Sequence, residues 1–189
     1  PSGATLDISA STLTPPATMP ASSGINFTAL NASNLGSGTV PAARLSGVGK
    51  VLQVLSASVG NVTTTTTSFA DTGLTVDITP AATSSKVLVL VDMVGLAKGA
   101  ENNSINMVLV RDSTDILEFA ALAGFNSSAD NNAVGGVGGN YLDSPSTTSA
   151  TTYKVQWALS AGSVGYQIGA WYSGSIRPLS TITVMEIGA

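Results

Sequence analysis

The chain contains neither cysteine nor histidine. Without cysteine it has no disulfides and no thiolate metal sites. Without histidine it lacks the commonest general base and the commonest ligand of transition metals. We therefore expect no metal, no other cofactor and no enzymatic activity.

Charged residues are scarce, at 10% of the sequence against about 25% in typical globular proteins. The 7 basic and 11 acidic residues give a net charge of -4, and no basic stripe is present to neutralise phosphates. We expect no binding to nucleic acid and none to anionic membranes. Soluble monomers rarely carry so little charge, so the composition favours a surface that is largely covered by partners.

Long hydrophobic runs are also missing. The longest, Val87–Val91, is far too short to cross a bilayer. The first residues lack the basic region and apolar core of a signal peptide. We expect no membrane insertion.

Residues 1–49 differ in composition from the rest. Prolines among Ser, Thr and Ala exclude a helix or a central strand in residues 1–23 and predict an extended strap. Aliphatic side chains then recur at every fifth position, which is the period of neither a helix nor a strand. These residues are Ile25, Leu30, Leu35, Val40 and Leu45.

The free energies indicate that this segment needs a partner. Burying five aliphatic side chains contributes about 10 kcal/mol. Ordering about 25 residues of backbone costs roughly 1–2 kcal/mol per residue. We therefore expect residues 1–49 to form an extended arm that orders only against other copies or a larger assembly. A disordered tail is the alternative.

From Lys50 the sequence predicts short β-strands, and no segment sustains a helical period. About eight strands in roughly 140 residues predict an all-β head over residues 50–189, an antiparallel sandwich of jelly-roll type. The segments expected as strands are Lys50–Val59, Thr63–Thr67, Leu74–Ile78, Lys86–Val94, Ile105–Arg111, Ile116–Leu122, Tyr153–Leu159, Tyr166–Tyr172 and Ser180–Ile187.

Two segments stand out within the head. Lys86–Val94 is nearly all aliphatic, which predicts a strand covered on both faces. The second face is covered either by self-association or by a tightly packed monomer. Gly124–Asn140 is rich in Gly, Asn and Ser, which predicts a long flexible loop.

Candidate chemical groups are few. The acidic residues in Asp112–Asp115, like Asp130, match no calcium-loop spacing and are better explained as turn formers. Glu118 and Glu186 are the only candidates for a glycosidase-type pair, and nothing in the sequence brings them together. Gly135–Gly139 lacks the Lys-Ser/Thr of a phosphate loop.

Aromatic residues sit mostly at alternating strand positions. Core packing is the first interpretation for Tyr153, Trp157 and Trp171, and a sugar-stacking platform is the second. Tyr141 follows the predicted loop, so we expect it to be exposed.

A resemblance to a known family emerges at the end of the arm. Asn34–Leu45 reads Asn-Leu-Gly-Ser-Gly-Thr-Val-Pro-Ala-Ala-Arg-Leu. It closely resembles a joint, Asn-Leu-Gly-x-Gly-Thr-Val-Pro-x-Ala-Arg-Leu, found in tail fibres and other fibrous virion proteins of tailed bacteriophages. The later part resembles the head domain that follows such joints in marine and cyanobacterial phage proteins. The matching pieces are Phe69–Leu74, Tyr141–Pro145, Thr151–Lys154 and Val184–Ala189.

The resemblance implies a homotrimer located on the virion, with its arms wrapped together or laid on other virion proteins and its β heads pointing outward. A tail-fibre-like role in binding a host-surface glycan or receptor is expected. Tail fibres are typically longer and begin with an attachment domain, which Pro1–Gly24 does not match. A capsid decoration protein, of the cement or head-fibre kind and strapped to the shell by its arm, is therefore the alternative.

Polar, Asn-rich loops are the candidates for a receptor contact, because such loops carry binding functions on rigid scaffolds. The candidate residues are Asn102, Asn103, Asn126, Asp130, Asn131, Asn132 and Tyr141.

Overall fold

The computed structural model describes residues 50–99, 101–125, 127, 133–161, 166–168 and 178–188. The predicted arm, with its five spaced aliphatic residues, lies outside the described residues. The described part forms ten strands: β1 Lys50–Val59, β2 Val62–Thr64, β3 Ala70–Ile78, β4 Lys86–Lys98, β5 Ile105–Arg111, β6 Thr114–Ala123, β7 Ala133–Asp143, β8 Thr151–Leu159, β9 Tyr166–Ile168 and β10 Ser180–Gly188.

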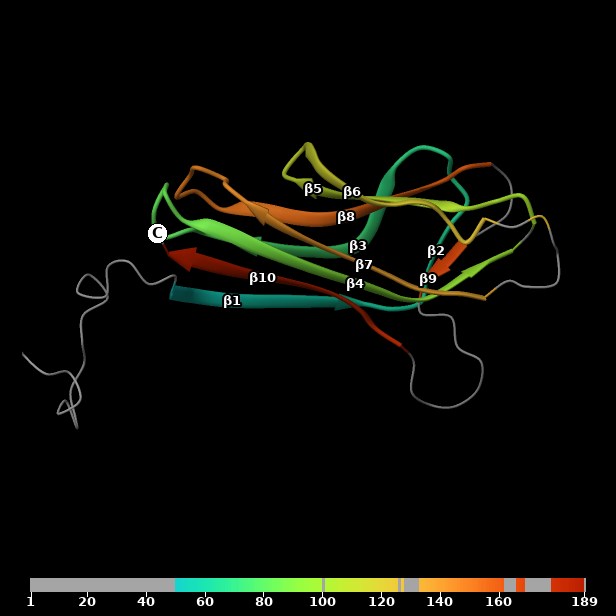
Figure 1. Cartoon of the computed structure of the whole chain (residues 1–189), viewed down its shortest axis with the longest axis horizontal. Helices are drawn as coiled ribbons and strands as arrows, with labels where there is room; N and C mark the ends of the chain where they lie inside the picture. The colour runs from blue at the N-terminus through green and yellow to red at the C-terminus, as the bar shows by residue number, and fades with distance from the viewer. Residues whose placement is uncertain are drawn as a thin grey trace, which may run out of the picture. The chain divides into compact units, whose positions relative to one another are not determined.

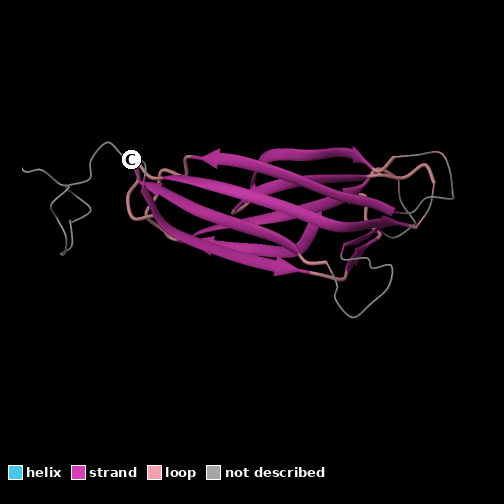
Figure 2. Cartoon of the chain, turned by 60° about the horizontal axis from the view of Figure 1, so that its bottom comes forward, coloured by secondary structure: helices cyan, strands magenta, loops and turns pink. Residues whose placement is uncertain are grey.

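The strands form two antiparallel sheets (Figures 1 and 2). Sheet A has the order β1-β10-β4-β9-β2, and β7 pairs with the other edge of β4. Sheet B has the order β3-β8-β5-β6. Apart from the short strands β2 and β9, the sheets are β1-β10-β4-β7 and β3-β8-β5-β6. This is the strand order of an eight-stranded jelly roll. The predicted all-β, jelly-roll-like sandwich is confirmed.

The core lies between the sheets and follows from strand periodicity. In β3 and β8 every second side chain is buried, and the intervening side chains are exposed or half-buried through most of each strand. Each large apolar side chain buried here contributes roughly 1.5–3 kcal/mol. The predicted core positions of Tyr153 and Trp157 are confirmed. The largest fully buried side chains are Trp157, Tyr153, Leu74, Ile78, Met93, Leu96, Ile105, Met107, Leu109 and Ile182.

Several boundaries differ from the prediction. The strand expected at Thr63–Thr67 is only Val62–Thr64 in the structure, because Thr66 leaves the ladder and its hydroxyl accepts the Ser68 N–H at 3.1 Å. Hydroxyl groups that bond local backbone in this way compete with sheet pairing. Of the strand expected at Tyr166–Tyr172, only β9 is described.

The prediction of a loop over Gly124–Asn140 is wrong from residue 133 onward, where β7 begins. Its glycines allow close packing. A Cβ at Gly139 would lie 2.7 Å from the Cβ of Phe119, and one at Gly136 would lie 3.0 Å from the carbonyl oxygen of Met93. Glycine in a strand can mark such a close approach rather than a loop.

The two faces of β4 differ in coverage. Val87, Val89 and Val91 point into the core and are buried. On the opposite face Leu88 is half-buried and Leu90 is 38% exposed. Within the described part of one chain, the outer face of β4 therefore lacks the cover that its apolar sequence predicts.

Candidate functional site

The strand pairings define two ends of the sandwich. Lys50 pairs with Gly188, and Val87 pairs with Asp143. The start of β1, the end of β10, the start of β4 and the end of β7 therefore lie together (Figure 1). We call this the β1 end, because residues 1–49 precede it in the chain.

The opposite end, here the far end, carries other connections. Ala97 near the end of β4 pairs with Ala133 at the start of β7. Ile105 at the start of β5 pairs with Ala123 at the end of β6. The β4–β5 and β6–β7 connections, which hold most of the predicted receptor residues, therefore leave the sandwich at the far end.

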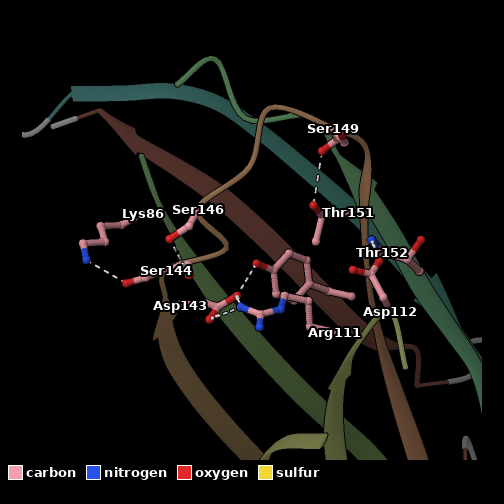
Figure 3. Close-up of polar contacts among 10 residues, drawn as sticks. Lys86, Arg111, Asp112, Asp143, Ser144, Ser146, Ser149, Thr151 and Thr152 are labelled. Carbon is pink, nitrogen blue, oxygen red and sulfur yellow. Dashed lines mark hydrogen bonds and ion pairs between the residues drawn. The ribbon is translucent and has the colours of Figure 1, made fainter. Parts of the chain in front are cut away.

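A buried carboxylate joins the two sheets near the β1 end. Asp143 ends β7 in sheet A and is 5% exposed. The Nη1 atom of Arg111 in β5 donates to both of its oxygens at 2.9 Å (Figure 3). The hydroxyl of Tyr153 in β8 donates to its Oδ2 at 2.6 Å. Because both partners belong to sheet B, these charge-assisted bonds fasten one sheet to the other.

The ionisation of these groups is consistent with a structural role. Burial, followed by the hydrogen bond to Asp143, raises the pKa of Tyr153. The hydrogen bond to Asp143 also raises the pKa of Arg111. The phenol therefore stays protonated and the guanidinium stays charged. Neither is prepared to exchange a proton near neutral pH, as a general acid or base must.

Glu186 holds the β3–β4 connection. It lies in β10 and is 1% exposed. Its Oε2 accepts a bond of 2.7 Å from the Gln53 amide, and its Oε1 accepts one of 2.7 Å from the Ala81 N–H. Burial alone would raise the pKa of Glu186. The nearby Ser85 hydroxyl and the bonds from Gln53 and Ala81 outweigh burial and lower it below its ordinary value of 4.5.

A hydroxyl-rich depression of about 370 Å³ also lies at the β1 end. Asp112, at its rim, has a φ of 54°, and its Oδ1 accepts the Thr152 N–H at 2.9 Å. Its own N–H donates to the Thr152 carbonyl at 2.8 Å. Asp112 lies in the turn between β5 and β6, as predicted, whereas Asp115 pairs with Val110 inside β6 and is not a turn residue. The residues that line the depression are Arg111, Asp112, Ser113, Thr114, Pro145, Thr147, Ser149, Ala150 and Thr151.

The two glutamates weighed as a glycosidase pair do not face each other. Glu118 is exposed in β6 of sheet B, whereas Glu186 is buried in β10 of sheet A. A glycosidase places both carboxyl groups on either side of one substrate bond. These residues do not supply that geometry.

The described ranges hold no group of three or more Asp, Glu, His or Cys residues that could bind a metal ion. They also include no helix with the length and apolarity needed to span a bilayer.

The predicted receptor residues differ in their exposure to solvent. Asn102 is exposed and has a φ of 53°. Asn103 is only 3% exposed, and its Oδ1 accepts the N–H groups of Ser104 at 2.9 Å and Ala161 at 3.3 Å. It therefore ties the β4–β5 connection to the segment after β8. The sequence predicts that Asn103 faces solvent, and this prediction is wrong.

Tyr141 also differs from its prediction. It lies within β7, is half-buried and packs against the core. The expected exposure assumed that a loop precedes it, whereas β7 does. The remaining candidates, Asn126, Asp130, Asn131 and Asn132, lie outside the described residues.

Sequence reasoning did not identify Arg111, Asp143 and Glu186 as buried anchors. Arg111 and Asp143 are 32 positions apart, and Gln53 and Glu186 are 133 apart. Only the predicted strand positions of Glu186 and Arg111 hinted at a partner, because a charge among apolar neighbours needs one.

We predict that Asp143→Ala lowers the free energy of unfolding by about 2–4 kcal/mol, because Arg111 and Tyr153 lose their buried acceptor. Urea unfolding at fixed protein concentration measures the change. Asp77→Ala is the matched control, since exposed Asp77 accepts only the Thr152 hydroxyl at 2.6 Å. A loss for Asp143→Ala no larger than for the control would contradict the sheet-joining role.

A second prediction concerns pH. Because folding lowers the pKa of Glu186, its ionised form stabilises the fold above pH 4.5, and this contribution is lost as pH falls through the lower folded value. Glu186→Gln should be less stable than wild type at neutral pH, and the difference should shrink below pH 4.5. Exposed Glu118→Gln serves as the control. A difference for Glu186→Gln that stays constant from pH 7 to about 2 would contradict the assignment.

No family model matches the chain, and no curated protein matches it. A crystal structure of the infectious bursal disease virus VP2 subviral particle matches with a TM-score of 0.37 and 13% identity, over 72% of this chain and 38% of that chain. A structure of the infectious bursal disease virus Gx strain matches with a TM-score of 0.33 and 16% identity, over 71% and 34%. This chain thus spans well under half of the chains it matches. The jelly-roll assignment depends on the strand order of the two sheets.

Proposed function

We propose that this chain is a non-enzymatic structural protein of a tailed-bacteriophage virion. It forms a homotrimer whose N-terminal arms attach it to the particle and whose jelly-roll heads point outward. The heads act in a tail-fibre-like way and contact the host surface with their far ends.

One observation carries this proposal. Lys50, which follows residues 1–49 in the chain, lies at the β1 end, whereas the β4–β5 and β6–β7 connections leave the sandwich at the far end. A head held through its arm therefore presents those connections away from its attachment. The tail-fibre joint resembled by Asn34–Leu45 supports the same orientation, because it precedes the head directly.

The surface chemistry of the far end supports a contact role. Leu122, near the end of β6, is 59% exposed, and Phe125, two residues beyond that strand, is 56% exposed. Exposed Asn102 belongs to the neighbouring connection. Large exposed apolar side chains beside polar groups are typical of binding sites. A host-surface glycan or protein receptor is the kind of partner that this surface suits.

We predict that purified full-length protein binds susceptible host cells and competes with phage adsorption. Phe125→Ser should weaken binding about tenfold or more, because exposed aromatic anchors dominate such contacts. Thr75→Ala, on the outer face of sheet B, should bind like wild type. Absence of binding to every susceptible host, or wild-type binding by Phe125→Ser, would contradict the host-contact role.

The capsid-decoration alternative is favoured by the predicted strap of residues 1–23, which contains prolines and only one charged side chain, that of Asp7. It predicts that full-length protein binds purified tailless capsids, whereas protein lacking residues 1–24 does not. The truncated protein should keep its head, judged by an unchanged melting temperature. Equal capsid binding by both proteins would reject a strap, and no binding by either would leave the tail as the attachment site.

A further inference from the structure

The outer faces of the two sheets differ in chemistry. On sheet B, exposed Asp71 pairs with Lys154, with 2.9 Å between the Lys154 Nζ and an Asp71 oxygen. The same carboxylate accepts a bond of 2.7 Å from the Gln156 amide. Paired charges and amides of this kind are typical of a sheet face in contact with water.

The outer face of sheet A instead carries an apolar row. Val54 pairs with Met185, Met185 with Leu88, and Leu88 with Leu142, so the row crosses four adjacent strands. Residues directly opposite one another share a face. The face is the outer one, because the alternate residues of β4 and β10 are buried. Val54 is 53% exposed and Leu142 is 56% exposed, while Met185 and Leu88 are half-buried.

The rows beside it carry little charge. Ser56, Thr183, Leu90 and Asn140 form the next row in the same register. Along β4, the charged residues of this face are Lys86 and Asp92, one at each margin. A face with so few charges, and with both signs present, does not repel an identical surface.

Strand β1 adds an exposed apolar edge. It is the terminal strand of sheet A, and Val51, Leu52 and Leu55 are 55%, 43% and 38% exposed. A long apolar edge strand tends to pair with other chains unless it is charged, short or covered. The only such features within β1 are Lys50 and a bulge between Val51 and Gln53.

We propose that a neighbouring copy of this chain packs against the outer face of sheet A and its β1 edge. The inference rests on the homotrimer of the proposed function and names its interface. Face and edge are different surfaces of one sheet, so each copy can offer its edge to the face of the next. Head-to-tail contacts of this kind can close into a ring.

The size of the face fits this occupant. Four strands about 4.8 Å apart and about nine residues long cover roughly 600 Å². In such a contact one copy buries its face and the next copy buries its edge, so the face by itself, at roughly 600 Å², approaches the value of about 800 Å² that a specific interface buries per partner. A different protein would have to recognise a surface that offers almost no charge. A second copy of this chain brings an apolar β1 edge to that apolar face.

Two lysines introduced into this face test the proposal. Because the proposal rests on a homotrimer, full-length wild type should have a mass in solution of three times 18.8 kDa. The double variant Val54→Lys, Leu142→Lys should shift to a single copy at the same concentration, because charges in a dry interface oppose association. Thr75→Lys on sheet B should keep the wild-type mass. Both positions are more than half exposed in one chain, so the melting temperature reports whether the head stays folded.

The absence of native cysteine allows a second measurement that does not need disruptive charges. A thiol at Leu142→Cys should react with a maleimide about tenfold more slowly than one at Thr75→Cys, because reaction requires an accessible thiolate. Equal rates, with an oligomeric mass unchanged by the lysines, would overturn this interface and leave the homotrimer standing. A monomeric wild type would overturn both.

Discussion

The two sheets are held together by contact between their inward side chains, and the position of every surface feature depends on that contact. Trp157, Tyr153 and Leu74 are among the large residues that fill the space between the layers. Because a sandwich buries one face of each strand, any polar residue at an inward position must find partners there. Asp143 and Glu186 occupy such positions, and both oxygens of each carboxylate accept hydrogen bonds. Asp143 thereby fastens sheet A to sheet B, and Glu186 holds the β3–β4 connection at the β1 end.

Because the chain carries few charges, its outer surfaces differ in how polar they are. On the outer face of sheet B, exposed Asp71 pairs with Lys154. The outer face of sheet A receives few charges and keeps an apolar row from Val54 to Leu142. The far end exposes Phe125 beside polar connections. The apolar outer face of sheet A and the exposed far end fit the proposed subunit, which is attached through residues 1–49, packed beside copies and presented outward.

Local patterns predicted most of the fold. Alternation in β3 and β8 indicated half-buried strands, and enough such segments indicated a two-layer β fold. The errors arose where the role of a residue depends on a contact with a residue that is distant in the sequence. The glycines of β7 suggested a loop. In the structure Gly139 lies in a strand, and Phe119 packs so close to it that a larger side chain would not fit. Asn103 suggested an exposed loop, yet its side chain satisfies backbone groups that include Ala161. The buried anchors were missed for the same reason, since their partners are brought close only by the fold.

We propose that this jelly roll belongs to a virion and is attached there through residues 1–49. Electron microscopy of purified phage particles, labelled with gold-conjugated antibody raised against the far end of the head, tests it most directly. The account predicts regular labelling at the tail or on the capsid surface of intact particles. Particles that carry no label, while the same antibody detects the protein in infected cells, would contradict it.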